Sequence, residues 1–207
     1  MYKAQYAILI DGGFITKKLY AKLKQHATAE DVMAECERLK TLPQVSDYEL
    51  LRIYYYDAPP SHEKTNKPVS GTSYNLSATD RFREAQSLHD KLVLKPNVAL
   101  RMGETRLSPN VWKIKPQVMK KVIRGGHQLV DDDFLLDISQ KGVDMRIGLD
   151  MARLALREMV RLVIVVTADS DFIPAFKFVR REGVRVIIDT MGHNATVGLK
   201  QHADEVL

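Results

Sequence analysis

Four short apolar segments of this chain lead into aspartate, and this pattern constrains the fold more than any other feature. The segments "ILID", "IYYYD" and "VIID" end at Asp11, Asp57 and Asp189, and "VVTAD" ends at Asp169. Each segment is short and rich in β-branched or aromatic residues, as expected for a strand that is buried in a sheet. The pattern therefore predicts several buried strands, each closed by a carboxylate.

Helical segments are expected between these strands. The predicted strands span residues 6–10, 50–56, 98–102, 162–166 and 184–188, and the predicted helices span residues 14–26, 28–42, 79–92, 145–157, 173–182 and 196–206. Thr28 and Asp31 have the spacing of a capping box, and Gly183 is placed to end a helix. The alternation predicts an α/β fold with a mostly parallel central sheet and helices on both faces.

Two stretches interrupt the alternation. Residues 59–79 contain three prolines and few aliphatic side chains, which predicts a loop. Residues 104–140 carry many basic side chains, and their pattern leaves extra strands or a flexible flap as alternatives. The acidic run "VDDDFLLD", residues 130–137, is interpreted as a solvated loop. A chain of 207 residues suits one domain, residues 1–207, with insertions near residues 59–79 and 104–140.

Composition excludes several classes of protein. A single cysteine, Cys36, rules out an internal disulfide and a Cys-rich zinc site, and it favours a reducing, cytoplasmic location. No apolar run approaches the roughly 18 residues that a membrane span needs. The chain lacks GxGxxG after the first strand, GxxxxGK[ST] and GxSxG, which argues against dinucleotide, P-loop and serine-hydrolase chemistry. The net charge of +5 favours polyanionic partners only weakly.

The aspartates at the strand ends suggest a metal site. Ligands of open α/β sheets bind at the carboxyl ends of the strands, so these side chains are expected at one rim. Clustered carboxylates repel each other unless a cation or a shared proton offsets the charge, and Mg²⁺ and Mn²⁺ prefer oxygen ligands. The candidate ligands are Asp11, Asp144 and Asp169, with Asp171 close by. Each could instead cap the helix that follows it.

Other polar residues are interpreted as structural. Asp57 and Asp189 are expected to cap the segments that follow them. Asp150 lies six residues after Asp144, roughly 240° round a helix, so it need not face the same way. The histidines show no metal-binding spacing, and those in polar contexts are expected at the surface: His62, His127 and His193.

Four motifs occur in the order "ILIDGGF", "RIYYYDAPP", "QKGVDMRIGLDMARLA" and "VIVVTADSDFIPAFKFVRREGVRVII". Together they resemble the NYN domain family of PIN-like ribonucleases. The resemblance implies a Rossmann-like, PIN-type three-layer sandwich with an acidic pocket that binds Mg²⁺ or Mn²⁺ and cleaves RNA. It implies catalytic roles for Asp11, Asp144, Asp169 and Asp171, of which the first three would bind the metal.

The resemblance also implies roles for neighbouring residues. Asp150 matches the second aspartate of the helix motif. Thr167 and Ser170 match hydroxyl positions that bind substrate phosphate or metal-bound water, and Lys141 is placed to meet the substrate backbone. Many members of the family carry Asn shortly after the first aspartate, where this chain has Phe14.

Single-stranded RNA is the expected partner, and a homodimer is left open. Trp112 and Tyr74 are candidates for stacking on bases. The candidates for positive walls along the RNA are Lys17, Lys18, Lys113, Lys115, Lys120, Lys121, Arg124 and Lys141.

Three functional hypotheses remain. The first is a metal-dependent endoribonuclease. The second is a non-catalytic RNA-binding protein that keeps the fold. The third is another phosphoryl enzyme with an acidic rim, although Toprim domains expect Glu after the first strand and dehalogenase-type phosphatases expect Asp-x-Asp there, where this chain has Asp11-Gly12-Gly13.

Overall fold

A six-stranded parallel sheet forms the centre of the molecule. The computed structural model describes residues 3–207, with the backbone alone described at residues 109–110. The strands lie in the order β10-β9-β8-β1-β2-β5, and every neighbouring pair is parallel. Their bounds are β1 (Ala4–Asp11), β2 (Tyr48–Asp57), β5 (Val98–Met102), β8 (Leu162–Val166), β9 (Arg185–Asp189) and β10 (Glu205–Val206). The predicted parallel sheet is confirmed.

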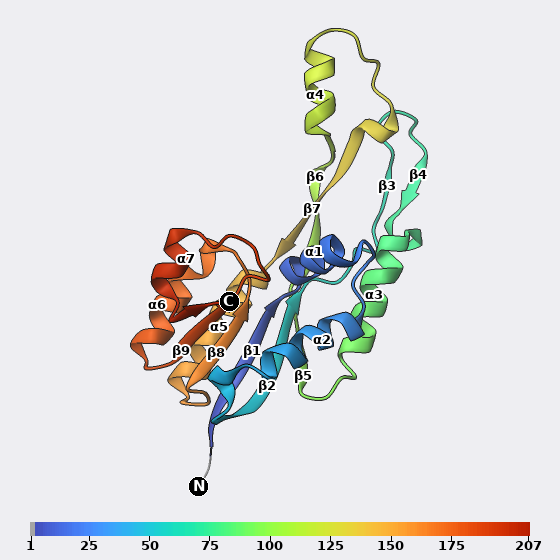
Figure 1. Ribbon diagram of the computed structural model, residues 1–207. Coiled ribbons are helices and arrows are strands. Elements are labelled where there is room, and N and C mark those ends of the chain that lie inside the picture. Colours follow the sequence, from blue (N-terminus) through green and yellow to red (C-terminus); the bar gives the residue numbers. More distant parts are fainter. Residues whose placement is uncertain (1–2) are drawn as a thin grey trace.

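Helices cover both faces of this sheet, which gives three layers (Figure 1). One face packs against α1 (Gly12–Leu23), α2 (Ala29–Lys40) and α3 (Asp80–Leu92). The other packs against α5 (Val143–Leu156), α6 (Ile173–Arg181) and α7 (Val197–His202). The strands are apolar on both faces because each face is buried under helices, and all five residues of β8 are buried. The predicted α/β sandwich is confirmed.

Local signals in the sequence explain where several helices begin and end. The side chains of Thr28 and Asp31 form the predicted capping box at the start of α2. Gly183 follows α6 with a φ of 80°, a conformation that favours glycine. Gly12 begins α1 where there is no room for a side chain, since a Cβ there would lie 2.7 Å from the carbonyl oxygen of Tyr56.

Two predicted segments need correction. The predicted loop at residues 59–79 contains a short antiparallel hairpin of β3 (Lys64–Asn66) and β4 (Ser73–Asn75). The helix predicted over residues 196–206 is too long, because α7 ends at His202 and the chain then adds edge strand β10. Asp204 redirects the chain, since its carboxylate accepts a hydrogen bond from the Val186 N–H at 2.7 Å and pairs with Arg180.

Residues 104–141 form a long arm that projects from the sandwich (Figure 1). Its shaft is the antiparallel pair β6 (Glu104–Ile114) and β7 (Phe134–Lys141). Its far end carries α4 (Pro116–Ile123). Of the two alternatives for this segment, extra strands are therefore correct.

The β3–β4 hairpin braces the arm. The Trp112 indole N–H donates to the carbonyl oxygen of Asn66 at 2.8 Å, and the Trp112 ring meets the Tyr74 ring edge-on with 5.6 Å between centroids. The Asp131 carboxylate accepts hydrogen bonds from the backbone N–H groups of Val69 and Ser70. Trp112 and Tyr74 thus contact each other and hold two insertions together.

The acidic run at residues 130–137 is ordered rather than a solvated loop, which corrects the prediction. Asp133 is buried, and its carboxylate lies 2.7 Å from Nε2 of His127 and accepts the Val130 N–H. His127 is only partly exposed for the same reason. These contacts close the chain between α4 and β7 into a fixed turn.

Candidate active site at the carboxyl edge of the sheet

Asp11 ends β1 and caps α1. One carboxylate oxygen accepts the Phe14 N–H at 3.0 Å, and the other accepts the Thr167 hydroxyl at 3.3 Å. Burial raises the pKa of Asp11, the two hydrogen bonds lower it, and the nearby Asp144 and Asp169 carboxylates raise it again, with a net rise. The strand therefore presents a carboxylate that is held in place and is costly to ionise.

The turn after β8 carries two more carboxylates. Thr167 is fully buried, and its hydroxyl oxygen accepts the Asp169 N–H at 3.2 Å. Asp169 in turn accepts the Asp171 N–H at 2.9 Å, so it caps the short helix Ser170–Phe172. The ring of Phe172 is buried under this turn, while Asp169, Ser170 and Asp171 are exposed.

Asp144 lies in the first turn of α5 and is exposed. Its pKa is raised by partial desolvation and then by the charges of Asp169 and Asp171. The predicted acidic residues from three separate segments of the chain therefore lie within electrostatic range of one another. Lys141, which ends β7 two residues before α5, is exposed.

The donor chemistry of this rim fits a hard divalent cation. All the facing groups are carboxylate oxygens, and their mutual repulsion is the kind that a bound cation relieves. Asp11, Asp144 and Asp169 would hold such an ion. Among the fully described residues, no three acidic, His or Cys side chains are close enough to enclose an ion in this arrangement, so the carboxylates would have to draw together around it.

Asp150 and Asp189 serve the fold. The Asp150 carboxylate accepts the Tyr56 hydroxyl at 3.0 Å and pairs with Arg101 at 2.9 Å. Asp189 is buried, pairs with Arg38 and accepts the Met191 N–H at 2.9 Å. The structural interpretation of Asp189 is confirmed, and the structure does not bring Asp150 to the other predicted residues.

Asp57 has a larger role than its sequence context indicates. It is buried, and its carboxylate accepts the Ala58 N–H at 2.7 Å and the Gln140 side-chain amide at 2.8 Å. Its other oxygen lies 3.0 Å from Nε2 of the buried His89. Asp57 therefore anchors the base of the arm to strand β2. In the sequence, the sign of the Asp57–Gln140 contact is the position of Gln140 directly before the "KGVD" motif.

The base of the arm also adjoins Asp11. A Cβ built on Gly13 would lie 3.5 Å from a carboxylate oxygen of Asp11 and 3.9 Å from the side-chain oxygen of Gln140. The Tyr55 hydroxyl nearby is buried and has no hydrogen-bond partner among the described residues. The arm therefore begins directly beside the acidic rim.

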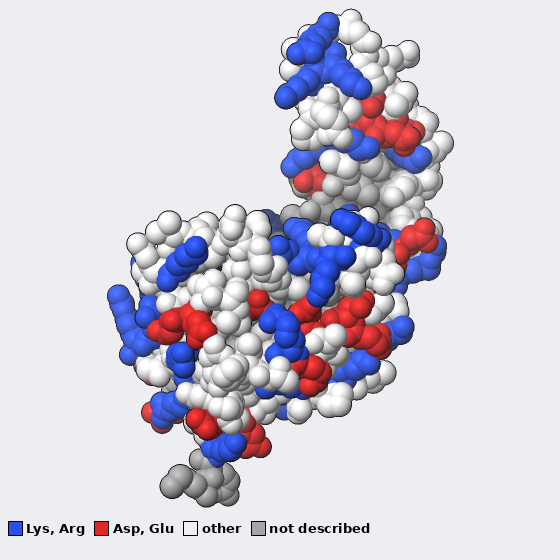
Figure 2. Space-filling model, viewed as in Figure 1, with Lys and Arg blue, Asp and Glu red and all other residues white. Residues whose placement is uncertain are grey.

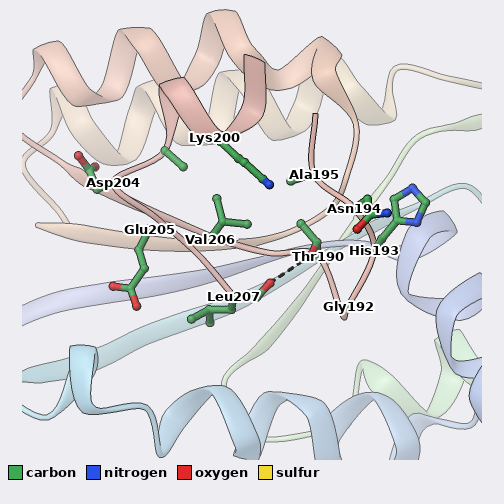
Figure 3. A pocket seen from close by; sticks show the side chains of 11 residues that line it. Thr190, Gly192, His193, Asn194, Ala195, Lys200, Asp204, Glu205, Val206 and Leu207 are labelled. Carbon is green, nitrogen blue, oxygen red and sulfur yellow. Dashed lines mark hydrogen bonds between the residues drawn. The ribbon is translucent and has the colours of Figure 1, made fainter. Parts of the chain in front are cut away.

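A cleft of about 550 Å³ lies beyond the end of β9 (Figure 3). Lys200 extends into it from α7, and the Thr190 hydroxyl donates to the carbonyl oxygen of Leu207 at 3.1 Å. His193, on its border, is exposed as predicted. None of the predicted site residues lines this cleft.

The described helices include none with the length and apolar character that crossing a membrane requires.

The parallel sheet and its two helical layers form a Rossmann-like α/β sandwich that is consistent with the PIN-like fold. Residues 112–207 match the model of the NYN domain family, which belongs to the PIN-like superfamily, and this match confirms the resemblance over the last two of the four motifs. The matched region includes Asp144, Asp169 and Asp171, and it begins within β6.

Solved structures support the same fold. A protein of unknown function, VPA0982 from Vibrio parahaemolyticus RIMD 2210633, is similar with a TM-score of 0.54 and 16% identity, covering 100% of this chain and 93% of that one. At this identity the likeness extends to the fold alone. No curated protein gives a significant match to the chain.

Proposed function

We propose that this protein is a metal-dependent endoribonuclease that hydrolyses RNA phosphodiester bonds at the acidic rim. One observation carries the proposal: Asp11, Asp144, Asp169 and Asp171 come from three separate segments, and the pKa of Asp11 and of Asp144 is raised by burial and then by the neighbouring carboxylates of this group. Such clustering lowers stability, and a cation-binding role accounts for it. The NYN match supports RNA as the substrate class of this proposal.

A Mg²⁺ or Mn²⁺ ion held by Asp11, Asp144 and Asp169 would lower the pKa of a bound water and offset charge on the phosphate. Asp171 orients the attacking water in this proposal. Thr167 and the Phe14 N–H fix the direction of the Asp11 carboxylate. The resemblance implies a substrate-binding role for Thr167. Because its hydroxyl is buried and already bonded to Asp11 and to the Asp169 N–H, we propose instead that it holds the Asp11 carboxylate in position.

Two exposed residues complete the proposed site. Lys141 would contact the RNA backbone as a point charge, and Ser170 would donate its hydroxyl to a phosphate oxygen. Both side chains are exposed; Ser170 follows Asp169 directly in sequence, and Lys141 lies three residues before Asp144.

The test is cleavage of a labelled single-stranded RNA in the presence of Mg²⁺ or Mn²⁺. Wild type would be compared with Asp144→Asn and Asp169→Asn, which keep the shape of the side chain and remove its charge. We expect at least a hundredfold loss in both variants, since each removes a metal ligand. Equal cleavage by all three proteins would exclude the proposal. Asp189→Asn is unsuitable as a control because Asp189 is buried and paired, so Asp47→Asn on the exposed surface serves instead.

A second candidate is a non-catalytic RNA-binding protein with the same fold. Phe14 favours it, because the position where many NYN members carry an amide holds an aromatic ring that packs near Lys18. This alternative predicts RNA binding with a steep salt dependence and no product under any metal condition.

The remaining assignments are also proposals. We propose one domain over residues 1–207 in which the β3–β4 hairpin and the arm are insertions into the sandwich. We further propose a cytoplasmic location, in accord with the single buried Cys36. The homodimer stays a prediction.

A further inference from the structure

The far end of the arm carries cations that form no ion pair with any of the described residues. We call Lys120, Lys121 and Arg124 the arm tip; all three are exposed, and residues 115–127 contain no acidic side chain. Figure 2 shows Lys and Arg gathered there, well away from the sandwich. Among the described residues, none of the three forms an ion pair within 4 Å.

The shaft of the arm is different. Lys113 pairs with Asp137 at 2.8 Å, and Arg106 pairs with Glu104 at 2.7 Å. The charges along the shaft are thus largely balanced, whereas those of the arm tip are free for a partner. A paired shaft below an unpaired tip indicates a contact made at the end of the arm.

The arm is fixed at both ends of its shaft. At its base, Gln140 donates to Asp57 beside the acidic rim, and further out Trp112 and Asp131 are bonded to the β3–β4 hairpin. Strand β7 has 8 residues, so at about 3.3 Å per residue it carries the chain roughly 25 Å from Lys141. Helix α4, also 8 residues, adds at most about 12 Å.

We propose that the arm tip binds the RNA backbone roughly 25–35 Å from the acidic rim, so that long RNA is held at two separated points. This inference rests on the proposed function of the rim. At about 3.4 Å per stacked nucleotide, the separation corresponds to roughly 7–10 nucleotides. The tip therefore gives the protein a preference for RNA longer than the site itself can contact.

An anionic lipid surface is the other polyanion that basic side chains next to Met119 and Ile123 would suit. One eight-residue helix with two exposed apolar side chains offers little area for insertion into lipid. The rigid connection between the tip and the rim favours a partner that reaches both, and RNA is such a partner.

The test measures RNA binding by fluorescence anisotropy, with EDTA present so that no cleavage occurs. The tip variant is Lys120→Gln, Lys121→Gln and Arg124→Gln. The probes are single-stranded RNAs of about 4 and about 24 nucleotides, one too short and one long enough to span rim and tip. A triple variant of Lys91→Gln, Arg157→Gln and Arg181→Gln is the matched control, because these exposed cations lie at the opposite edge of the sheet.

We expect the tip variant to bind the long RNA about tenfold more weakly. The slope of log K against log salt should become smaller in magnitude by about 2, because each of the three lost phosphate contacts contributes about 0.7. Binding of the short RNA should change less than about twofold, and the control should match wild type. Thermal melting of both triple variants should match wild type, because all six positions are exposed.

Unchanged binding of the long RNA by the tip variant would overturn the proposal, as would equal loss on both RNAs. So would a loss confined to vesicles of phosphatidylserine and phosphatidylcholine, which would assign the tip to lipid. The proposed nuclease function fails separately: RNA that is bound through the tip and never cut would exclude cleavage and leave the tip contact standing. Cleavage that is unchanged by the tip substitutions and by RNA length would support the nuclease function and exclude the tip contact.

Discussion

The Thr167 hydroxyl donates to the Asp11 carboxylate at 3.3 Å, across two neighbouring parallel strands. The preceding residues, Ile10 and Val166, are register partners in β1 and β8, so the two side chains leave the sheet side by side. Thr167 is fully buried and also accepts the Asp169 N–H. One hydroxyl therefore fixes the relative positions of two carboxylates that are 158 residues apart in sequence, from position 11 to position 169.

Thr167→Val should lower RNA cleavage by about 10- to 100-fold, the usual effect of removing a group that orients a metal ligand. Valine keeps the shape of the side chain but cannot donate to Asp11. Thr167→Ser keeps the hydroxyl and should retain most of the activity. Cleavage rates at saturating Mn²⁺ provide the measurement, and a valine variant as fast as wild type would refute the orienting role.

The fold could be predicted from the sequence where hydrophobic pattern and capping signals coincide. Strand β8 has the predicted bounds, and the Thr28–Asp31 capping box marks the start of α2. The β3–β4 hairpin could not be predicted, because strands of three residues leave no readable alternation and depend on contacts with Trp112 and Asp131. Strand β10 depends likewise on Asp204 bonding to Val186, a contact between segments that no local pattern shows.

Asp11→Asn should stabilise the metal-free protein. Burial is the main cause that raises the pKa of Asp11, so the folded state disfavours the ionised carboxyl. As pH rises, the Asp11 carboxyl ionises in the unfolded chain first, near pH 4, and in the folded protein only at a higher pH. The resulting loss of folding stability is therefore absent below about pH 4 and complete above the raised pKa of the folded state. Asparagine is also a good helix N-cap. In EDTA at pH 7, the variant should melt about 2 °C higher than wild type.

The same comparison repeated with Mn²⁺ tests the metal assignment. The ion should raise the melting midpoint of wild type by mass action and have a much smaller effect on Asp11→Asn. Near pH 3, where both proteins carry a neutral side chain, their midpoints should agree. A lower midpoint for the variant in EDTA at pH 7 would contradict the predicted cost of ionising Asp11.

Gly12 and Gly13 should respond oppositely to alanine. A Cβ on Gly12 would collide with the Tyr56 backbone and the Tyr55 ring at 2.7 and 2.9 Å, whereas the nearest atom to a Cβ on Gly13 is at 3.5 Å. We expect Gly12→Ala to lower the free energy of unfolding by about 1–3 kcal/mol. Gly13→Ala should be neutral or slightly stabilising, since alanine favours helix. Urea unfolding would decide, and equal stability of the two variants would contradict the close approach.

Asp57→Ala should destabilise the protein by about 2–4 kcal/mol, because it leaves the buried partners of Asp57 without an acceptor. Those partners are Ala58, Gln140 and His89. The exposed Asp169 provides the comparison: Asp169→Asn should unfold at nearly the same urea concentration as wild type and yet lose cleavage. An Asp57→Ala protein with wild-type stability would show that the anchor of the arm is dispensable.

The candidate site could be predicted in part for a physical reason. The carboxyl ends of parallel strands share one edge, so the strand positions alone place Asp11 near Asp169. The direction of a side chain depends on its partners, which is why Asp150 turns towards Arg101 and Asp57 towards Gln140 without any sign in the local sequence. The sequence shows Thr167 as a polar residue at the end of a strand. Its burial depends on the position of β8 between β9 and β1, which the local sequence does not reveal.

The position of β1 in the middle of the sheet has a consequence for the nascent chain. Strand β1 pairs with β2 on one side and with β8 on the other, and β8 begins at Leu162. During synthesis the β1–β2–β5 half can form early from local contacts, whereas Asp11 gains its Thr167 partner only after β8 has emerged and docked. A nascent chain from which β8 and the turn after it have not yet emerged therefore carries no complete acidic rim, and the site assembles only once residues 162–171 are available to dock.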